Sequence, residues 1–311
     1  MPLMRNLFLS LSHNERLRQA ASRFGPARAM VRRFVAGETL EEALAAVAAL
    51  NRDGLLATLD HLGENVTSEH EARDATTEIL DLLEGIASHD VRSGVSLKLT
   101  QLGMDLGPAL AAENLERIVA RAAEIGRFVR IDMESYDYVQ PTLDLFEELW
   151  ARYKNVGVVI QSYLYRSAGD VARLVEMGAS VRLVKGAYDE PPEVAFPDKA
   201  DTDANYIRLM EQLFADGARA RGVFPAIATH DEKLIAWAKE HAREHQIPPD
   251  RYEFQMLYGV RPLELRRLVD IGHVARSYVP YGPGWYEYYL HGFVERPDNL
   301  ALFMRSLLGK R

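Results

Sequence analysis

The sequence predicts a (β/α)₈ barrel, in which eight parallel strands close into a ring surrounded by helices. From about residue 54 onward, short apolar and β-branched runs alternate with amphipathic helical patterns, and eight such runs occur. Several runs are almost continuously apolar, as expected of parallel strands covered on both faces. An open, doubly wound sheet shares this alternation. Eight regular units favour closure, and roughly 250 residues is the usual size of such a barrel.

Each expected strand is an apolar run bounded by polar or turn residues. In chain order the strands cover residues 54–63, 94–100, 127–134, 156–163, 180–186, 223–230, 252–258 and 275–281.

Apolar side chains spaced three and four residues apart predict the helices. One helix opens at Thr39–Glu42 before the first strand, a second follows the capping spacing of Ser68 and Glu71, and Gly178 is placed to end a later one. The apolar stripes of these and one further helix consist of Leu40, Leu44 and Val47; Ala72, Ala75, Ile79, Leu82, Leu83 and Ile86; Leu115, Ile118, Val119 and Ala122; and Val171, Leu174 and Val175.

The 311 residues contain no Gly/Ser/Pro-rich linker and no break in composition, which predicts one domain. Within it, residues 1–52 form an expected helical N-terminal segment and residues 53–311 the barrel. Hydrophobic residues make up 48% of the chain, enough for a large core, so a disordered tail is excluded.

Charge and cysteine content narrow the function. The formal charge of −8 gives no general attraction to nucleic acid or anionic lipid. The absence of cysteine removes disulfides, thiol nucleophiles and cysteine-bound metals. No apolar run is long enough to cross a bilayer, and the first residues lack a signal-peptide pattern. We therefore expect a cytoplasmic protein that acts on a small molecule.

Catalytic residues of a barrel lie at the carboxyl ends of the strands and in the loops that follow. Polar or ionisable residues stand at all of the expected strand ends: Asp60, Glu64, Lys98, Asp132, Glu134, Gln161, Lys185, His230, Asp231, Gln255 and Tyr278. Because some polarity there is generic, each residue alone is as consistent with loop capping as with function.

Lys98 and Lys185 both follow apolar runs, so each ammonium group is expected to project into the barrel mouth. Three interpretations remain open for them. Either lysine could form a Schiff base with a carbonyl substrate, as in barrel aldolases, or could bind an anionic substrate as a plain cation. Either could also be a rim lysine with no role in chemistry.

Two familiar motifs are judged to be structural or absent. His241-Ala-Arg-Glu244-His245 fits the zinc spelling H-x-x-E-H, but His241 continues an apolar stripe and the pair lies in the last helical turn. We expect no metal site. The chain has no Walker A sequence or strand-linked G-x-G-x-x-G, and Gly282-Pro-Gly284 is expected to form a turn rather than a Rossmann cradle.

Taken as a set, the strand ends carry motifs in a family-specific order. The motifs are Ser96-Leu-Lys98, Arg130-Ile-Asp132-Met-Glu134, Gln161-Ser-Tyr-Leu-Tyr165-Arg166, Arg182-Leu-Val-Lys185-Gly-Ala-Tyr188, Ala228-Thr-His230-Asp231, Glu253-Phe-Gln255-Met-Leu257-Tyr-Gly259, Tyr278-Val-Pro-Tyr-Gly282 and Glu295-Arg296-Pro297. This series closely resembles the monofunctional bacterial proline dehydrogenases, from about Glu38 to Leu308.

The resemblance implies an FAD-dependent barrel whose last helix closes the barrel mouth. It implies oxidation of L-proline to 1-pyrroline-5-carboxylate, with hydride passing to flavin N5 and electrons then to a quinone. Because that quinone is membrane-borne, transient contact with the inner membrane is expected, although no amphipathic anchor stands out.

The resemblance also assigns roles by position. The expected FAD-binding residues are Gln161, Arg182, Lys185, Gly186, Thr229, His230 and Gln255. The expected substrate-binding residues are Lys98, Asp132, Ala187, Leu257, Tyr278, Tyr288 and His291. Lys98, Tyr278 and Glu295 are the expected catalytic residues, with Glu295 on the closing helix.

One departure bears on the substrate. Where the family has two consecutive arginines that pair with the proline carboxylate, this chain has His291 and Gly292. Three explanations stay open: weak proline binding shared by Lys98 and His291, a different cyclic or N-substituted amine, or an engineered and more open pocket. A lysine-dependent lyase and a flavin-binding protein without turnover are the remaining alternatives.

Overall fold

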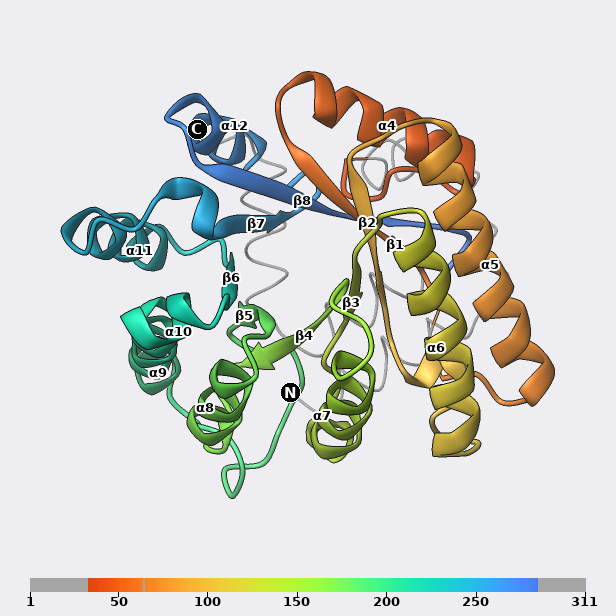
Figure 1. The fold of residues 1–311 in the computed structure, drawn as a ribbon, viewed down its shortest axis with the longest axis horizontal. Coiled ribbons are helices and arrows are strands. Elements are labelled where there is room, and N and C mark those ends of the chain that lie inside the picture. Colours follow the sequence, from red (N-terminus) through yellow and green to blue (C-terminus); the bar gives the residue numbers. More distant parts are fainter. Residues whose placement is uncertain (1–32, 64, 285–311) are drawn as a thin grey trace, which may run out of the picture.

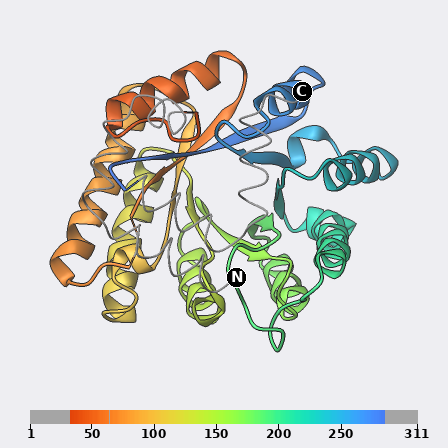
Figure 2. The same cartoon turned by 180° about the vertical axis from the view of Figure 1, so that it is seen from behind.

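The computed structural model describes residues 33–63 and 65–284. Its centre is a closed barrel of eight strands in the order β1 to β8, with every neighbouring pair parallel (Figures 1 and 2). The strands are β1 (Leu56–His61), β2 (Ser93–Leu97), β3 (Val129–Ile131), β4 (Val156–Gln161), β5 (Ser180–Val184), β6 (Phe224–Ala228), β7 (Glu253–Leu257) and β8 (Val274–Tyr281). The predicted fold class and all eight expected strands are confirmed.

The helices surround the strands (Figure 1). They are α4 (Leu40–Arg52), α5 (Glu69–Ser88), α6 (Pro108–Glu124), α7 (Tyr136–Trp150), α8 (Ser167–Glu176), α9 (Lys199–Phe214), α10 (Asp216–Ala220), α11 (Glu232–Glu244) and α12 (Pro262–Asp270), with short 3₁₀ helices η1 (Thr100–Leu102) and η2 (Pro249–Arg251). The expected closing helix lies outside the described residues, as does most of the expected N-terminal helical segment.

The expected helix ends have clear local causes. Thr39 and Glu42 form a reciprocal capping box at the start of α4. Ser68 caps α5 through the Glu71 amide, while the Glu71 carboxylate accepts from the Thr67 amide at 2.7 Å. Gly178, with φ of +69°, follows α8 and lets the chain leave the helix.

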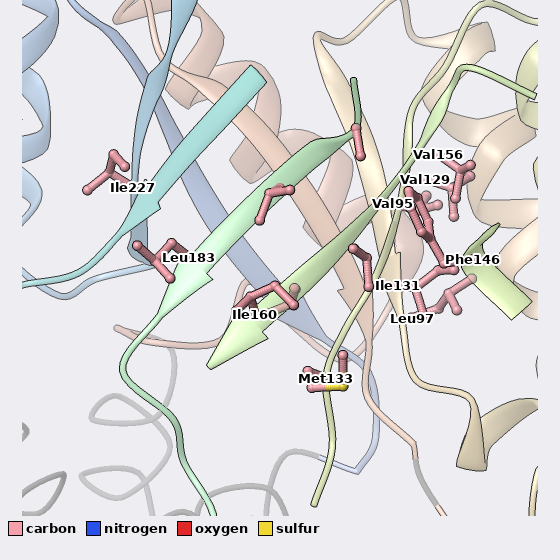
Figure 3. Close-up of a cluster of buried hydrophobic side chains, with 14 of the residues drawn as sticks. Val95, Leu97, Val129, Ile131, Met133, Phe146, Val156, Ile160, Leu183 and Ile227 are labelled. Atoms are coloured by element: carbon pink, nitrogen blue, oxygen red, sulfur yellow. The ribbon is translucent and has the colours of Figure 1, made fainter. Parts of the chain in front are cut away.

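Alternation along the strands separates two environments. Most outward side chains are apolar and belong to the buried core beneath the helices. Figure 3 shows part of this core: Val95, Leu97, Val129, Ile131, Val156, Ile160, Leu183 and Ile227 of the strands, with Phe146 of α7. The intervening positions carry polar side chains that contact one another across non-neighbouring strands. Arg182 of β5 reaches Ser96 of β2, for example. Such contacts are made only through the barrel interior, so these polar side chains lie on its inner face.

The inner half nearer the amino ends of the strands is closed by ion pairs and hydrogen bonds. Arg276 pairs with Glu253 at 2.9 Å and donates to the Ala57 carbonyl at 2.7 Å. Arg130 donates to the Val158 and Ser180 carbonyls at 3.1 and 2.8 Å. These bonds fix the strands beneath the barrel mouth.

Within the described ranges, no helix is long and apolar enough to span a membrane.

Candidate active site

Asp132, directly after β3, joins four strands at the barrel mouth. Its Oδ1 accepts hydrogen bonds from Ser96 at 2.7 Å and from Arg182 Nη1 at 2.6 Å, and its Oδ2 accepts from the Tyr278 hydroxyl at 2.7 Å. Three donors from three other strands therefore converge on one carboxylate. Two predicted site residues, Arg182 and Tyr278, are therefore brought together by a third, Asp132.

Arg182 is held in a defined orientation by this network. Its Nη1 also donates to Ser96 Oγ at 3.1 Å, and its guanidinium carbon lies 5.2 Å from the centre of the Tyr278 ring. Its Nε is buried and has no hydrogen-bond partner among the described residues. A buried donor left in this way is normally satisfied by a partner, so Arg182 presents an unused donor inside the barrel.

Asp60 and Lys98 form a second ion pair at the mouth, between β1 and β2. Lys98 Nζ lies 3.6 Å from Asp60 Oδ2, and the two side chains are 13% and 0% exposed. Neither Asp60 oxygen makes a hydrogen bond within the described part of the chain. Burial raises the pKa of the Asp60 carboxyl, and the positive charge of Lys98 works against that rise. Lys98 is thus engaged by charge at a distance too long for an ordinary hydrogen bond.

Lys185, after β5, is held by two carboxylates. It pairs with Asp203 of α9 and, at 2.8 Å, with Asp231. Burial opposes ionisation of Asp231, but the hydrogen bond and charge of Lys185 outweigh it and lower the pKa of Asp231 to about 2. Gly186 follows with φ of +121°, and a Cβ there would lie 2.3 Å from the Tyr163 ring. Only glycine fits this turn.

His230, after β6, is fixed as a neutral ring. Burial, and to a smaller extent the nearby Arg261 charge, lowers the pKa of His230 to about 4. Its Nε2 accepts a hydrogen bond from the Leu257 amide at 3.0 Å. A neutral imidazole that accepts at Nε2 carries its proton on Nδ1. His230 therefore offers an N–H donor over a wide pH range.

The remaining predicted polar residues are buried and hydrogen-bonded. Gln161 donates to the Glu134 carbonyl at 2.9 Å, Gln255 donates to Glu253, and Thr229 Oγ1 accepts from the Asp231 amide at 3.1 Å. The Glu134 carboxylate accepts from the Thr100 hydroxyl at 2.6 Å and so braces the loop after β2.

The predicted apolar residues of the site are exposed. Leu257 is 39% exposed at the end of β7, and Ala187 is also exposed. Exposed apolar surface beside polar groups is typical of a ligand-binding position. Tyr288, His291 and Glu295 lie outside the described residues.

The H-x-x-E-H histidines are engaged in packing on α11. His241 stacks on Trp237 and His245, with ring centres 4.6 and 4.0 Å apart. His245 Nδ1 contacts the His241 carbonyl at 2.9 Å at the helix end. Among the described residues, no group of three or more acidic or histidine side chains could hold a metal ion.

Comparison with known proteins identifies the family. The family model described as Proline dehydrogenase matches residues 43–285. Proline dehydrogenase 1 of Bacillus subtilis is 42% identical over 309 residues, which cover 99% of this chain and 100% of that protein. The chain belongs to the proline dehydrogenase family. Proline dehydrogenase of Deinococcus radiodurans is 40% identical over 284 residues, or 90% of each chain.

Solved structures agree with this family membership. Proline utilization A (PutA) from Bdellovibrio bacteriovorus, inactivated by N-propargylglycine, is 30% identical with a TM-score of 0.78. The match covers 86% of this chain and 32% of that longer one. A PutA variant from Bradyrhizobium japonicum, 24% identical over 88% of this chain and 31% of its own, has a TM-score of 0.72 and supports the fold alone.

The donor set fits the FAD on which the proline dehydrogenase family depends. A flavin ring accepts hydrogen bonds at its carbonyl oxygens and ring nitrogens, and is tuned by charge near them. Arg182 Nε is a buried donor without a partner among the described residues, and Nδ1 of neutral His230 carries an N–H. Lys185 adds a cation between them along the chain. Three donors from the ends of two successive strands, β5 and β6, thus match an acceptor-rich ligand.

Sequence reasoning missed three supporting residues of this site. Ser96 and Asp203 bind Asp132 and Lys185, respectively, and Asp60 pairs with Lys98. Asp60 stands at an expected strand end and Ser96 in the first family motif, but the sequence assigns neither a partner. A linear sequence does not show which carboxylate pairs with which cation. Asp203 lies inside α9, and a search restricted to strand ends does not include helix residues.

Proposed function

We propose that this protein oxidises L-proline to 1-pyrroline-5-carboxylate with FAD and passes the electrons to a quinone. The observation that carries the proposal is the Asp132 network. In a chain of this family, it brings Arg182 and Tyr278 together at the barrel mouth, with Lys98 also following β2 there. Bound FAD supplies the hydride-accepting chemistry, while the protein binds, orients and tunes the reactants.

Several residues have proposed roles in holding FAD. Arg182, fixed by Asp132 and Ser96, provides a cation that favours negative charge on the reduced cofactor. His230 provides a neutral N–H donor, and Gly186 leaves room for close backbone approach. The other proposed FAD-binding residues are Gln161, Lys185, Thr229 and Gln255.

A second group has proposed roles in holding proline. The Lys98 ammonium group binds the carboxylate, and Tyr278, oriented by Asp132, packs against the ring. Leu257 adds an apolar wall, which favours a saturated five-membered ring over more polar substrates. The remaining proposed contacts are Ala187, Tyr288 and His291, with Glu295 on the closing helix. We also propose that all of them belong to a single domain.

Product formation tests this function. Purified protein loaded with FAD is incubated with L-proline and a soluble quinone, and 1-pyrroline-5-carboxylate and quinol are quantified by mass spectrometry and absorbance. Equal amounts of the two products are expected. Failure to form either product, by a protein that retains FAD, would contradict the proposal.

A related amine is the second candidate substrate, and the charge balance of the mouth favours it. Each strand-end cation described above has a carboxylate partner: Asp60 for Lys98, Asp132 for Arg182, and Asp203 and Asp231 for Lys185. The arginine pair that binds proline in the family is His291-Gly292 in this chain. The net attraction for a carboxylate is therefore weaker than in the family.

Substrate comparison separates the two candidates. Reduction of the bound flavin is followed with L-proline, with pyrrolidine, which lacks a carboxylate, and with N-methylproline. A proline dehydrogenase is reduced fastest by L-proline at equal concentration. Faster reduction by either of the other amines would assign the second substrate class.

A further inference from the structure

Asp60 is a buried carboxylate to which the proposed reaction assigns no role. It is fully buried on β1, neither oxygen makes a hydrogen bond within the described ranges, and Lys98 Nζ lies 3.6 Å away. A carboxylate buried in this way costs stability unless a charge compensates it. Burial raises the pKa of Asp60, which means that folding disfavours its ionised form in spite of Lys98.

The neighbouring Asp132 shows how a fully hydrogen-bonded carboxylate is held in the same barrel. Asp132 accepts hydrogen bonds from Ser96, Arg182 and Tyr278, all at 2.6–2.7 Å. Asp60 faces Lys98, Asp132 and His61, and the Tyr278 hydroxyl, which donates to Asp132, also favours its ionised form. Two carboxylates in such different surroundings normally have different tasks. Asp60 is poorly suited to joining strands, so its relation to Lys98 needs another explanation.

The position of Asp60 determines where the Lys98 ammonium group can stand. β1 is paired with β2 and β8 on both sides, so Asp60 is rigidly placed beside Ser96, its register partner. The Lys98 side chain is only 13% exposed. Without a nearby negative charge, an ammonium group in that setting would swing outward to water.

We propose that Asp60 is a positioning residue that holds the charged Lys98 ammonium group where it recognises the substrate carboxylate. The proposal rests on the proposed function, because it takes Lys98 as the carboxylate-binding residue. The long separation suits this task. A tight hydrogen bond to Asp60 would compete with the substrate, whereas attraction at 3.6 Å orients the ammonium group by charge alone.

A double-mutant cycle on ligand binding tests this role without requiring turnover. Calorimetry on the FAD-loaded enzyme gives dissociation constants for cyclopentanecarboxylate and for its neutral isostere cyclopentanecarboxamide. The wild type is expected to prefer the carboxylate by about tenfold or more. Asp60→Asn and Lys98→Met are each expected to abolish this preference, and the double variant is expected to lose no more than Lys98→Met alone.

Two further variants separate positioning from general damage. Asp60→Glu retains the charge and should keep part of the preference. Glu190→Gln changes a carboxylate that accepts from the Tyr136 amide at 2.7 Å and is not among the groups that face Asp60, so it should leave the preference unchanged. Thermal unfolding at pH 8 establishes that Asp60→Asn is folded under the conditions of the binding measurement.

Three results would overturn the proposal. They are an unchanged or increased carboxylate preference in Asp60→Asn, additive losses in the double variant, or a wild type that does not prefer the carboxylate. If Asp60→Asn does not fold, Asp60 is structural and the proposal is also wrong. Flavin reduction by L-proline is measured separately. If the flavin is reduced but Asp60→Asn keeps the carboxylate preference, only the role of Asp60 is wrong. If L-proline does not reduce the flavin, the proposed function is wrong.

Discussion

Lys98 and Lys185 follow two strands of the same barrel but are held in opposite ways. Lys98 lies 3.6 Å from the buried Asp60 carboxylate, whereas Lys185 lies between two carboxylates, one of them at 2.8 Å. A tightly paired cation is fixed in place, while a loosely paired one can still bind an incoming anion. The comparison therefore suggests that Lys185 belongs to a permanent part of the site and Lys98 to the part that exchanges substrate.

Replacing each lysine by methionine is the strongest way to break this comparison. Lys98→Met should lower kcat/KM for L-proline about 100-fold, because a charge-assisted contact is worth roughly 1.5–3 kcal/mol, while its flavin content stays near that of the wild type. Lys185→Met leaves Asp203 and Asp231 without their shared cation and should chiefly lower flavin content. Steady-state kinetics and the ratio of flavin to protein check both. The same defect in the two variants would contradict the distinction.

The His230 side of the mouth should be sensitive to acid. Because the pKa of His230 is lowered to about 4, its contribution to stability is complete above about pH 6.5 and is lost as the pH falls toward 4. The loss should reach about 3 kcal/mol near pH 4, at 1.36 kcal/mol per pKa unit. Urea unfolding at pH 7 and pH 4.5 measures it. His230→Asn should lack this component of the pH dependence, and equal slopes for the two proteins would contradict the assignment.

Restoring the family's arginines sharpens the substrate side. His291→Arg together with Gly292→Arg adds cations that a carboxylate can bind, so KM for L-proline should fall by about tenfold or more. KM for pyrrolidine, which has no carboxylate, serves as the control and should change little. An unchanged KM for L-proline would mean that side chains at these two positions do not bind the substrate carboxylate.

The smallest expected effect concerns the Asp132 network. Tyr278→Phe removes the 2.7 Å hydrogen bond to Asp132 but keeps the ring over Arg182. A single hydrogen bond contributes about 1 kcal/mol, so kcat/KM for L-proline should fall about fivefold with flavin content unchanged. Loss of flavin instead would assign Tyr278 to cofactor binding.

The fold was predictable because its cause is local. Outward residues such as Val95, Val129 and Val158 make each strand read as an apolar run, and capping pairs such as Thr39 with Glu42 mark where helices begin. The inner polar residues appear at alternate positions of the same runs. Eight such units specify a barrel before any long-range contact is known.

The pairing inside the site was not predictable, because it arises only when the sheet closes. Asp132 meets Tyr278 across the barrel, although the two residues come from β3 and β8. Arg276 and Glu253, which close the barrel beneath the mouth, look in the sequence like ordinary charged residues of late strands. The residue types at strand ends follow from the sequence, but which side chains form pairs depends on how the sheet closes into a barrel.

One measurement tests the central claim most directly. The visible spectrum of the purified, FAD-loaded protein is recorded without oxygen before and after addition of L-proline. The account predicts a yellow flavin spectrum that bleaches on addition of L-proline. A yellow spectrum that L-proline leaves unchanged would contradict proline oxidation, and a colourless protein that cannot be reconstituted with FAD would contradict the proposed cofactor site.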